Sequence, residues 1–309
     1  MELSIIDCSQ RYAIITPAHN EAGYVRLTIK SVIRQTILPR RWVIVDDGST
    51  DDTPEIIKSY ADRYGFVQCV RRARDEGRTY FASNVYAIME GVRLLRDQLF
   101  EFLAILDADI TLPVDYYEQI LARFGADPRL GVASGIYENL VDGELEKVLN
   151  DRRSTPKAIQ VFRRACFEQI GGYVPLKYGG EDTCACVMAR MAGWKSWSFP
   201  ELKVIHHRPT GMGSARDILH VRFRQGLCEY GLATHPLFMI VKSLRRCVLE
   251  RPWVVGGILR LAGYSYGYLR RERRQLPSEV ARYLRREQFG RIFSLNRMPK
   301  RDRVEGGVS

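Results

Sequence analysis

The sequence lacks the long apolar run of a membrane-spanning helix. Such a helix needs about eighteen consecutive residues with few or no charges, whereas the apolar segment Trp253 to Leu269 is shorter and is interrupted by Arg260. The beginning of the chain, MELSIIDCSQRYAIIT, also lacks the basic residues and the long apolar stretch of a secretory signal peptide. We therefore expect neither a spanning helix nor a cleaved leader.

Three motifs that would define other classes of protein are also absent. The seven cysteines include no zinc-type C-x-x-C pair, which predicts reduced, mostly buried thiols, as in a cytosolic protein. No G-x-G-x-x-G follows the first apolar segment, which argues against a Rossmann dehydrogenase. No nucleic-acid-binding module is recognisable either.

Acidic residues are scarce in the C-terminal third. Residues 215 to 309 have 8 Asp and Glu against 20 Lys and Arg, whereas residues 1 to 214 have 28 against 27. The net charges of the two parts are therefore +12 and −1, which together give the +11 of the whole chain. This asymmetry predicts an anionic partner for the C-terminal third, either nucleic acid or an acidic membrane surface.

Short apolar segments in the first part of the chain predict strands that are buried on both faces. They cover residues 12–16, 42–45, 66–71 and 102–106. Helical patterns lie between them, at residues 22–35, from Thr53 as N-cap and Pro54 onward, and at 83–95. Strands that alternate with helices predict the α/β class, with a mostly parallel, doubly wound sheet.

Polar residues gather where three of these strands end, at 17–21, 46–53 and 107–109. The carboxyl ends of parallel strands form the ligand-binding edge of an open sheet, so a nucleotide-sized crevice is expected there. Asp107 and Asp109 can both turn toward one hard cation. The alternative for this pair alone is two solvated loop aspartates.

Four motifs together resemble those of a known family. PAHNE, VIVDDGSTDDT, LDAD and GGEDTCACVMARMAGW occur in this order between about residues 11 and 210. They are similar to the motifs of inverting family 2 glycosyltransferases with the GT-A fold, of the bacterial polysaccharide type. The resemblance implies a catalytic domain over residues 1–214, with a donor half at about 11–110 and an acceptor half at about 111–214.

The resemblance also implies which residues bind the sugar nucleotide. The donor side would comprise Pro17, Ala18, Glu21, Asp46 or Asp47, Arg78, and Asp107. Carboxylates there would accept hydrogen bonds from the base and the ribose. The alternatives are a plain turn and helix cap for residues 47–53 and an ordinary surface position for Arg78.

A divalent cation, Mn²⁺ or Mg²⁺, is implied at the diphosphate. Asp109 is the expected ligand, Asp107 would contact the metal or the ribose, and His206 or His207 would complete the set, with a structural role as the alternative for the histidines. Arg208 would pair with phosphate in a bidentate manner. The cation would stabilise the leaving diphosphate.

Glu181 and Asp182 open a helix that is expected to run to about Met191. Carboxylates are favoured at helix N-termini for structural reasons alone. By the resemblance, however, Asp182 is the catalytic base that takes a proton from the acceptor hydroxyl, and Glu181 lies on the acceptor side. One base and no carboxylate nucleophile predict direct displacement with inversion.

Residues 215–297 are expected to form a helical, amphipathic and basic extension, and residues 298–309 a disordered tail. Apolar residues recur at helical spacing from Leu237 to Leu249, and arginines follow the apolar segment that ends at Leu269. Three alternatives remain for the extension: a bundle packed on the catalytic domain, docking on the inner face of the cytoplasmic membrane, and, with least support, nucleic-acid binding.

We therefore predict a glycosyltransferase that moves a sugar from a nucleotide donor, a UDP-sugar by the resemblance, to a hydroxyl of a saccharide or lipid-linked saccharide. Its setting would be surface polysaccharide or glycolipid assembly. The alternatives are a nucleotidyltransferase of similar fold, which would release pyrophosphate, and a non-enzymatic adaptor on an inactive scaffold that binds membrane or RNA.

Overall fold

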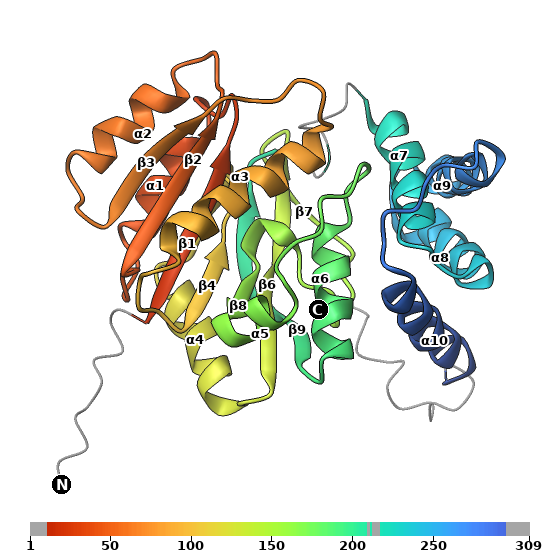
Figure 1. The fold of residues 1–309 in the computed structure, drawn as a ribbon. Helices are drawn as coiled ribbons and strands as arrows, with labels where there is room; N and C mark the ends of the chain where they lie inside the picture. Colours follow the sequence, from red (N-terminus) through yellow and green to blue (C-terminus); the bar gives the residue numbers. More distant parts are fainter. Residues whose placement is uncertain (1–10, 209–210, 212–216, 295–309) are drawn as a thin grey trace, which may run out of the picture. The chain divides into compact units, whose positions relative to one another are not determined.

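The computed structural model describes residues 11–208, 211 and 217–294. The chain divides into two compact units between Val221 and Arg222, inside helix α7 (Ile218–Gly231) (Figure 1). The first unit contains the mixed α/β part, and the second is helical. The tail at 298–309, which was predicted to be disordered, lies outside the described residues.

A single sheet forms the centre of the first unit. Four strands are parallel: β1 (Tyr12–Ala18), β2 (Arg41–Asp47), β3 (Val67–Arg72) and β4 (Phe102–Ile105). The others are β5 (Ile110–Thr111), β6 (Leu130–Val141), β7 (Glu144–Lys147), β8 (Val161–Arg163) and β9 (Lys195–His206). The order is β3-β2-β1-β4-β8-β6-β9-β5, and β7 pairs with β6.

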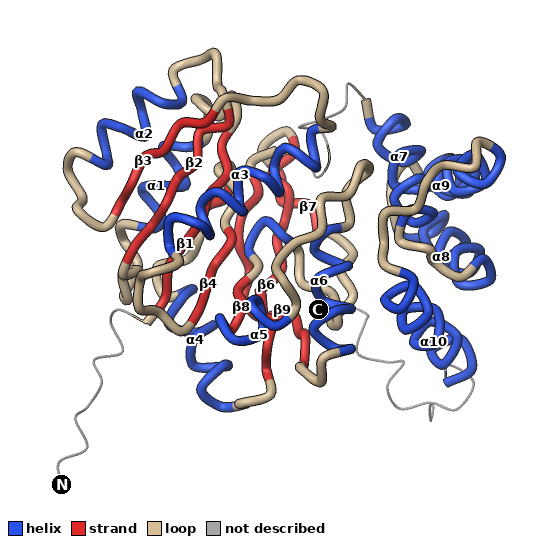
Figure 2. The backbone as a smooth tube through the Cα atoms, viewed as in Figure 1, coloured by secondary structure: helices blue, strands red, loops and turns tan. Residues whose placement is uncertain are grey.

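Helices cover both faces of this sheet (Figure 2). Alternate residues of β1 enter opposite cores: Tyr12 and Ile14 pack on one side, and Ala13 and Ile15 on the other. The first core also takes residues from α1 (Val25–Val32), α2 (Thr53–Ala61) and α4 (Tyr116–Ala126). The second takes residues from α3 (Tyr80–Leu95), α5 (Arg164–Gln169) and α6 (Glu181–Met191).

The predicted α/β class is confirmed, but parallel pairing does not extend over the whole sheet. β8 is antiparallel to both β4 and β6, whereas β6 and β9 are parallel. Residues 157–159 form a 3₁₀ turn (η2), although the mostly apolar run from Ala158 to Phe162 favours a strand. The amide of Gln160 donates to the backbone oxygen and hydroxyl of Thr155, which closes this turn before β8 begins.

The second unit consists of the rest of α7 with α8 (Pro236–Leu249), α9 (Trp253–Leu269) and α10 (Ser278–Ser294). Tyr230, Met239 and Tyr264 form a small core between α7, α8 and α9. α10 buries Val280 and Leu284, and its Gln288 accepts from the backbone N–H of His235. No helix of the described chain combines the length and hydropathy needed to cross a membrane.

Six of the seven cysteines lie in the described ranges, and none of these six forms a disulfide. Cys166, Cys184 and Cys186 are buried in the first unit, and Cys69, Cys228 and Cys247 are half-buried. The packing therefore agrees only in part with the prediction of mostly buried thiols.

Candidate active site

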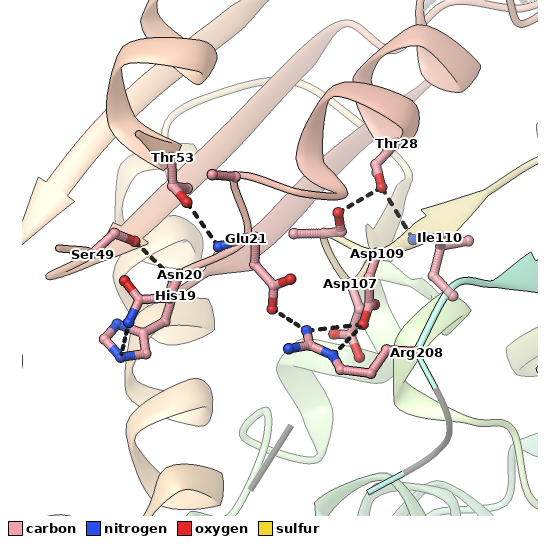
Figure 3. A network of polar contacts seen from close by, with 12 residues as sticks. His19, Asn20, Glu21, Thr28, Ser49, Thr53, Asp107, Asp109, Ile110 and Arg208 are labelled. Atoms are coloured by element: carbon pink, nitrogen blue, oxygen red, sulfur yellow. Dashed lines mark hydrogen bonds and ion pairs between the residues drawn. The ribbon is translucent and has the colours of Figure 1, made fainter. Parts of the chain in front are cut away.

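The predicted site residues of the donor side come from three neighbouring strand ends. β2, β1 and β4 are adjacent and parallel, so Asp46 and Asp47, Glu21, and Asp107 to Asp109 follow the same edge of the sheet. Figure 3 shows Glu21, Asp107 and Asp109 grouped around the guanidinium of Arg208.

Side chains of the loop after β2 fix the loop after β1. The backbone N–H of Glu21 donates to Thr53 Oγ1 at 2.7 Å, and that of Asn20 donates to Ser49 Oγ at 2.9 Å. Asn20 has a positive φ of 55°, which its side chain tolerates, and its Oδ1 accepts from the N–H of Thr50. Thr53 is the first residue of α2 instead of the predicted N-cap, and its hydroxyl holds Glu21 in place.

Asp46 and Asp47 are both fully buried at the end of β2. Asp46 Oδ1 accepts from the backbone N–H of Ser49, and Oδ2 lies 3.3 Å from Arg71 Nε. Asp47 Oδ2 accepts from Arg74 and from the Ser83 hydroxyl, each at 2.7 Å. Both carboxylates thus have cationic partners, Arg71 at the end of β3 and Arg74 on the segment after it, which the sequence pattern did not indicate.

Thr28 of α1 orients the segment that carries Asp109. Its hydroxyl donates to the backbone oxygen of Ala108 at 2.7 Å and accepts from the N–H of Ile110 at 3.1 Å (Figure 3). This double contact fixes the peptide units on both sides of Asp109. Thr28 was not predicted as a site residue because nothing in the sequence connects it to residue 109.

Arg208 bridges the first and third strand ends. It donates to Asp109 Oδ2 from Nε and Nη2 at 3.1 and 3.0 Å, and Nη2 also donates to Glu21 Oε1. Burial and the nearby Asp109 raise the pKa of Glu21 to about 7, in spite of the contact with Arg208. Burial also opposes ionisation of Asp109, but His206 and Arg208 outweigh it and lower the pKa of Asp109 to about 2.

His206 lies beside Asp109, whereas His207 makes different contacts. His206 Nε2 is 3.3 Å from Asp109 Oδ1, and Nδ1 is 3.1 Å from Asn139 Oδ1. His207 Nε2 contacts the hydroxyl of Thr111 at 2.7 Å, and its ring stacks on Tyr24. Of the two predicted histidines, His206 is therefore the one that is grouped with the aspartates.

Asp109 and His206 offer one oxygen and one nitrogen donor on the same side of β5 and β9. In the part of the chain that the structure describes, no three His, Cys, Asp or Glu side chains are grouped to hold a metal by themselves. Two donors still fit Mg²⁺ or Mn²⁺ at a nucleotide site, because such ions keep waters and take substrate phosphates as further ligands. Asp107, the third predicted ligand, is bound to a lysine instead.

Lys157 links the donor side to the acceptor side, and the sequence did not indicate it. Its Nζ lies 2.6 Å from Asp107 Oδ1 and 3.1 Å from Asn84 Oδ1, while its backbone N–H donates to Asp182 Oδ2 at 3.3 Å. Burial opposes the charge of Lys157, but the attraction of Asp107 and Glu181 outweighs it and raises the pKa of Lys157. A lysine after a proline is common in loops, so its role could not be inferred from the pattern.

Glu181 and Asp182 form the first turn of α6, as predicted. Two glycines with positive φ, Gly179 at 90° and Gly180 at 95°, turn the chain into this helix. Burial and the neighbouring Asp182 raise the pKa of Glu181 to about 7, and its Oε2 is buried without a hydrogen-bond partner. Burial also raises the pKa of Asp182, although the N–H groups of Thr183 and Lys157 stabilise its charge.

Arg78 has local partners. It pairs with Asp75 at 2.9 Å, and its guanidinium lies 3.7 Å from the ring centroid of Tyr86. Pro17 and Ala18 are buried as the last residues of β1, where Ala18 pairs with Asp46 of β2.

The structure thus brings together Glu21, Asp107, Asp109 and His206. It places Asp182 beside Lys157 and gives Arg78 no contact with this group.

A sequence profile of glycosyl transferase family 2 matches residues 13–179, which is more than half of the chain. The chain belongs to glycosyl transferase family 2. Among curated proteins, the glycosyltransferase AglE of Haloferax volcanii is 24% identical over 266 residues, which cover 80% of this chain and 81% of AglE. This family 2 glycosyltransferase thus shares most of its length with AglE.

Solved glycosyltransferases share its fold. The mannosyltransferase PcManGT of Pyrobaculum calidifontis, in complex with GDP-Man and Mn²⁺, has a TM-score of 0.56 at 18% identity, over 92% of this chain and 80% of PcManGT. Residues 1–349 of S. aureus TarS, in complex with UDP-GlcNAc, give 0.55 at 13% identity, over 93% of this chain and 92% of the other. The GT-A fold is therefore confirmed, together with a helical C-terminal region.

Proposed function

We propose that this glycosyltransferase transfers a sugar from a nucleotide donor, a UDP-sugar, to an acceptor hydroxyl with inversion at the anomeric carbon. The observation that carries this proposal is that Lys157 links two sets of acidic residues. One group, Glu21, Asp107 and Asp109, lies at the ligand-binding edge of the sheet. The other is Asp182 at the start of α6, and Lys157 contacts both Asp107 and Asp182.

The donor's base and ribose would lie against the ends of β1 and β2. Asp46 Oδ2 and Asp47 Oδ1 face Arg71 and Arg72 at 3.3 and 3.5 Å but accept no hydrogen bond among the described residues, so they have acceptor capacity for base N–H and ribose hydroxyl groups. Pro17 and Ala18 would form the wall there. Arg78 would reach the donor only after leaving Asp75 and Tyr86.

The diphosphate would lie next to Asp109, His206 and Arg208. A cation held by Asp109 and His206 would neutralise the charge that grows on the leaving diphosphate. Arg208 has the fork geometry that suits bidentate phosphate binding. Its hydrogen bonds to Glu21 and Asp109 hold the guanidinium beside the expected position of the diphosphate.

Asp182 would act as the general base. Its raised pKa makes it a better proton acceptor than an exposed aspartate, and α6 holds it in a fixed position. Direct in-line attack by the acceptor oxygen needs one base and no covalent intermediate, which inverts the configuration. We propose a saccharide or lipid-linked saccharide as the acceptor, in surface polysaccharide or glycolipid assembly.

The test is to incubate the full chain with individual sugar nucleotides, Mn²⁺ or Mg²⁺, and candidate acceptors, and to identify the products. The proposal expects a nucleoside diphosphate and a new glycosidic bond of inverted configuration. Release of pyrophosphate would instead identify a nucleotidyltransferase. A product of retained configuration would overturn the direct displacement, and no turnover with any donor and acceptor would favour the adaptor.

A further inference from the structure

The second unit exposes large apolar side chains along two packed helices. On α9 they include Leu269, which is 81% exposed, and on α8 Val248, which is 71% exposed. We call the whole set the apolar surface of α8 and α9: Leu237, Ile240, Val241, Leu244, Val248 and Leu249, with Trp253, Val254, Val255, Ile258, Tyr266, Tyr268 and Leu269. On α8, residues 237, 240, 241, 244 and 248 have the spacing of one helical face.

The inward side of α9 contains four glycines, Gly256, Gly257, Gly263 and Gly267, beside the buried Arg260 and Tyr264. A Cβ added to Gly263 would lie 2.0 Å from the backbone oxygen of Phe223, and one added to Gly257 would lie 2.2 Å from Cys247 Sγ. On the facing helix α7, a Cβ at Gly226 would lie 2.1 Å from the backbone oxygen of Arg260. The helices therefore approach closely through glycines, and α8 and α9 turn most of their large aliphatic side chains outward. Helices that are surrounded by lipid pack in this way.

One cluster of charged side chains in the same unit lies between its helices. Glu250 forms ion pairs with Arg222 at 2.6 Å, Arg246 at 2.6 Å and Arg260 at 2.7 Å. Arg260 is 4% exposed and lies in the middle of α9. In water-soluble bundles charged side chains mostly face outward, whereas this cluster lies between the helices. Ionisable residues in membrane proteins likewise face the bundle interior and pair with one another.

Cations without a carboxylate partner flank the apolar surface. Arg251 precedes α9, while Arg270, Arg271 and Arg273 follow it, and none of them pairs with a carboxylate of the described residues. Trp253, Tyr266 and Tyr268 lie near the same two ends of α9. With 17 residues α9 is about 25 Å long. Arginines and aromatic rings at both ends suit a helix whose two ends are at the same depth in the headgroup region.

We propose that the apolar surface of α8 and α9 docks into the headgroup and upper acyl region of an anionic membrane, with α9 in the membrane plane. The free arginines favour anionic lipid over a second copy of this chain, because two such units would bring like charges together. The exposed apolar side chains of α9 would insert among the upper acyl chains and supply the hydrophobic contribution to binding. This binding does not depend on the donor, the acceptor or the reaction.

The first test is flotation of the full chain with vesicles of phosphatidylcholine, with and without phosphatidylglycerol. The protein should float with the anionic vesicles, and less of it at high salt, because charges on the surface are screened beyond about 8 Å at physiological ionic strength. Absence of binding to anionic vesicles at low salt would overturn the proposal.

A pair of double variants makes the test specific. Val254→Glu/Ile258→Glu changes two exposed residues of α9, and Leu99→Glu/Val114→Glu changes two comparably exposed residues of the first unit. Only the first variant should lose vesicle binding, by about tenfold or more. Equal loss in both variants would show a general effect of charge and would overturn the proposal.

Other occupants of the surface give different results. A second copy would produce concentration-dependent dimers without vesicles, which Val254→Glu/Ile258→Glu would abolish. The first unit packed on the surface would make this variant unfold at a lower temperature than the Leu99→Glu/Val114→Glu control. If the unmodified chain does not float, either result would show that the surface is covered by a second copy or by the first unit instead of a membrane.

Discussion

Asp109 and Asp182 have different partners, and this gives their substitutions different expected effects. Asp109 contacts His206 and Arg208, whereas Asp182 accepts from the backbone N–H groups of Lys157 and Thr183. We expect Asp109→Ala to abolish the metal-stimulated part of donor binding. Asp182→Asn should keep donor binding and lower transfer by about a hundredfold or more. Donor binding by calorimetry and turnover under saturating donor measure the two effects, and equal loss of donor affinity in both variants contradicts the division of roles.

Lys157 is expected to act as a positioning residue for Asp182. Burial raises the pKa of Asp182, but the positive charge of Lys157 favours the ionised carboxylate and so limits this rise. In Lys157→Met, the acidic limb of the pH profile of kcat should therefore move to higher pH, in addition to any loss of rate. Lys203→Met removes a more exposed lysine that pairs with Glu138 and should leave the profile in place. An unshifted profile in Lys157→Met would mean that the lysine has only a structural role.

Glu181 should make stability depend on pH. Its pKa is raised from 4.5 to about 7 on folding, so the folded chain binds this proton more tightly than the unfolded chain. The protonated form contributes stability that is present below pH 4.5 and is lost as the pH rises to about 7. Glu181→Gln should therefore raise the free energy of unfolding by roughly 1 to 3 kcal/mol at pH 8 and change it little at pH 4. Denaturant titrations at both pH values measure this difference.

The matched control is Glu144→Gln on the exposed strand β7. It should change stability little at either pH. A stabilisation by Glu181→Gln that is the same at pH 4 and pH 8 would falsify the assignment of the buried proton to Glu181.

At the scale of elements, the sequence predicted the strands and helices of residues 11–110 well because the rules for them are local. The strands at 12–18, 41–47 and 67–72 and the helices α3 and α6 follow from apolar runs and helical spacing within a few residues. The arrangement of β8, β6 and β9 depends on contacts between segments that are far apart in sequence. Neither the 3₁₀ turn at Lys157 nor the contact of Arg208 with Glu21 has a local pattern, so neither could be predicted.

The close approach of α9 and α7 predicts a specific packing defect. In Gly263→Ala, the added Cβ would lie 2.0 Å from the backbone oxygen of Phe223, so the two helices must separate. We expect a loss of about 1 to 3 kcal/mol in the stability of the second unit. Gly231→Ala, at the end of α7, meets nothing within 4 Å and should be neutral or slightly stabilising. Thermal unfolding of both variants measures this, and equal melting temperatures would contradict the packing.

At the scale of the whole molecule, the preference for a donor can be measured as the rise in melting temperature that each nucleotide sugar causes. A nucleotide sugar that binds the folded chain but not the unfolded one stabilises it by about 2.7 kcal/mol at a concentration of a hundred times Kd. We expect a UDP-sugar with Mn²⁺ to raise the melting temperature more than a GDP-sugar with Mn²⁺. The measurement is a thermal-shift screen of the full chain, with Asp109→Ala as the control that should lose the metal-dependent part. A larger shift with a GDP-sugar would reassign the donor.

The division between the two units lies between Val221 and Arg222, within the continuous helix α7. Exchange of modules between related enzymes succeeds best where an exposed loop can be cut and rejoined, because few contacts cross it. Here a cut at the boundary would leave each part with an unfinished helix and four unsatisfied backbone groups at each new end. The C-terminal unit should therefore not be transferable to another catalytic unit by fusion at this point, and chimaeras must carry the whole of α7 on one side of the junction.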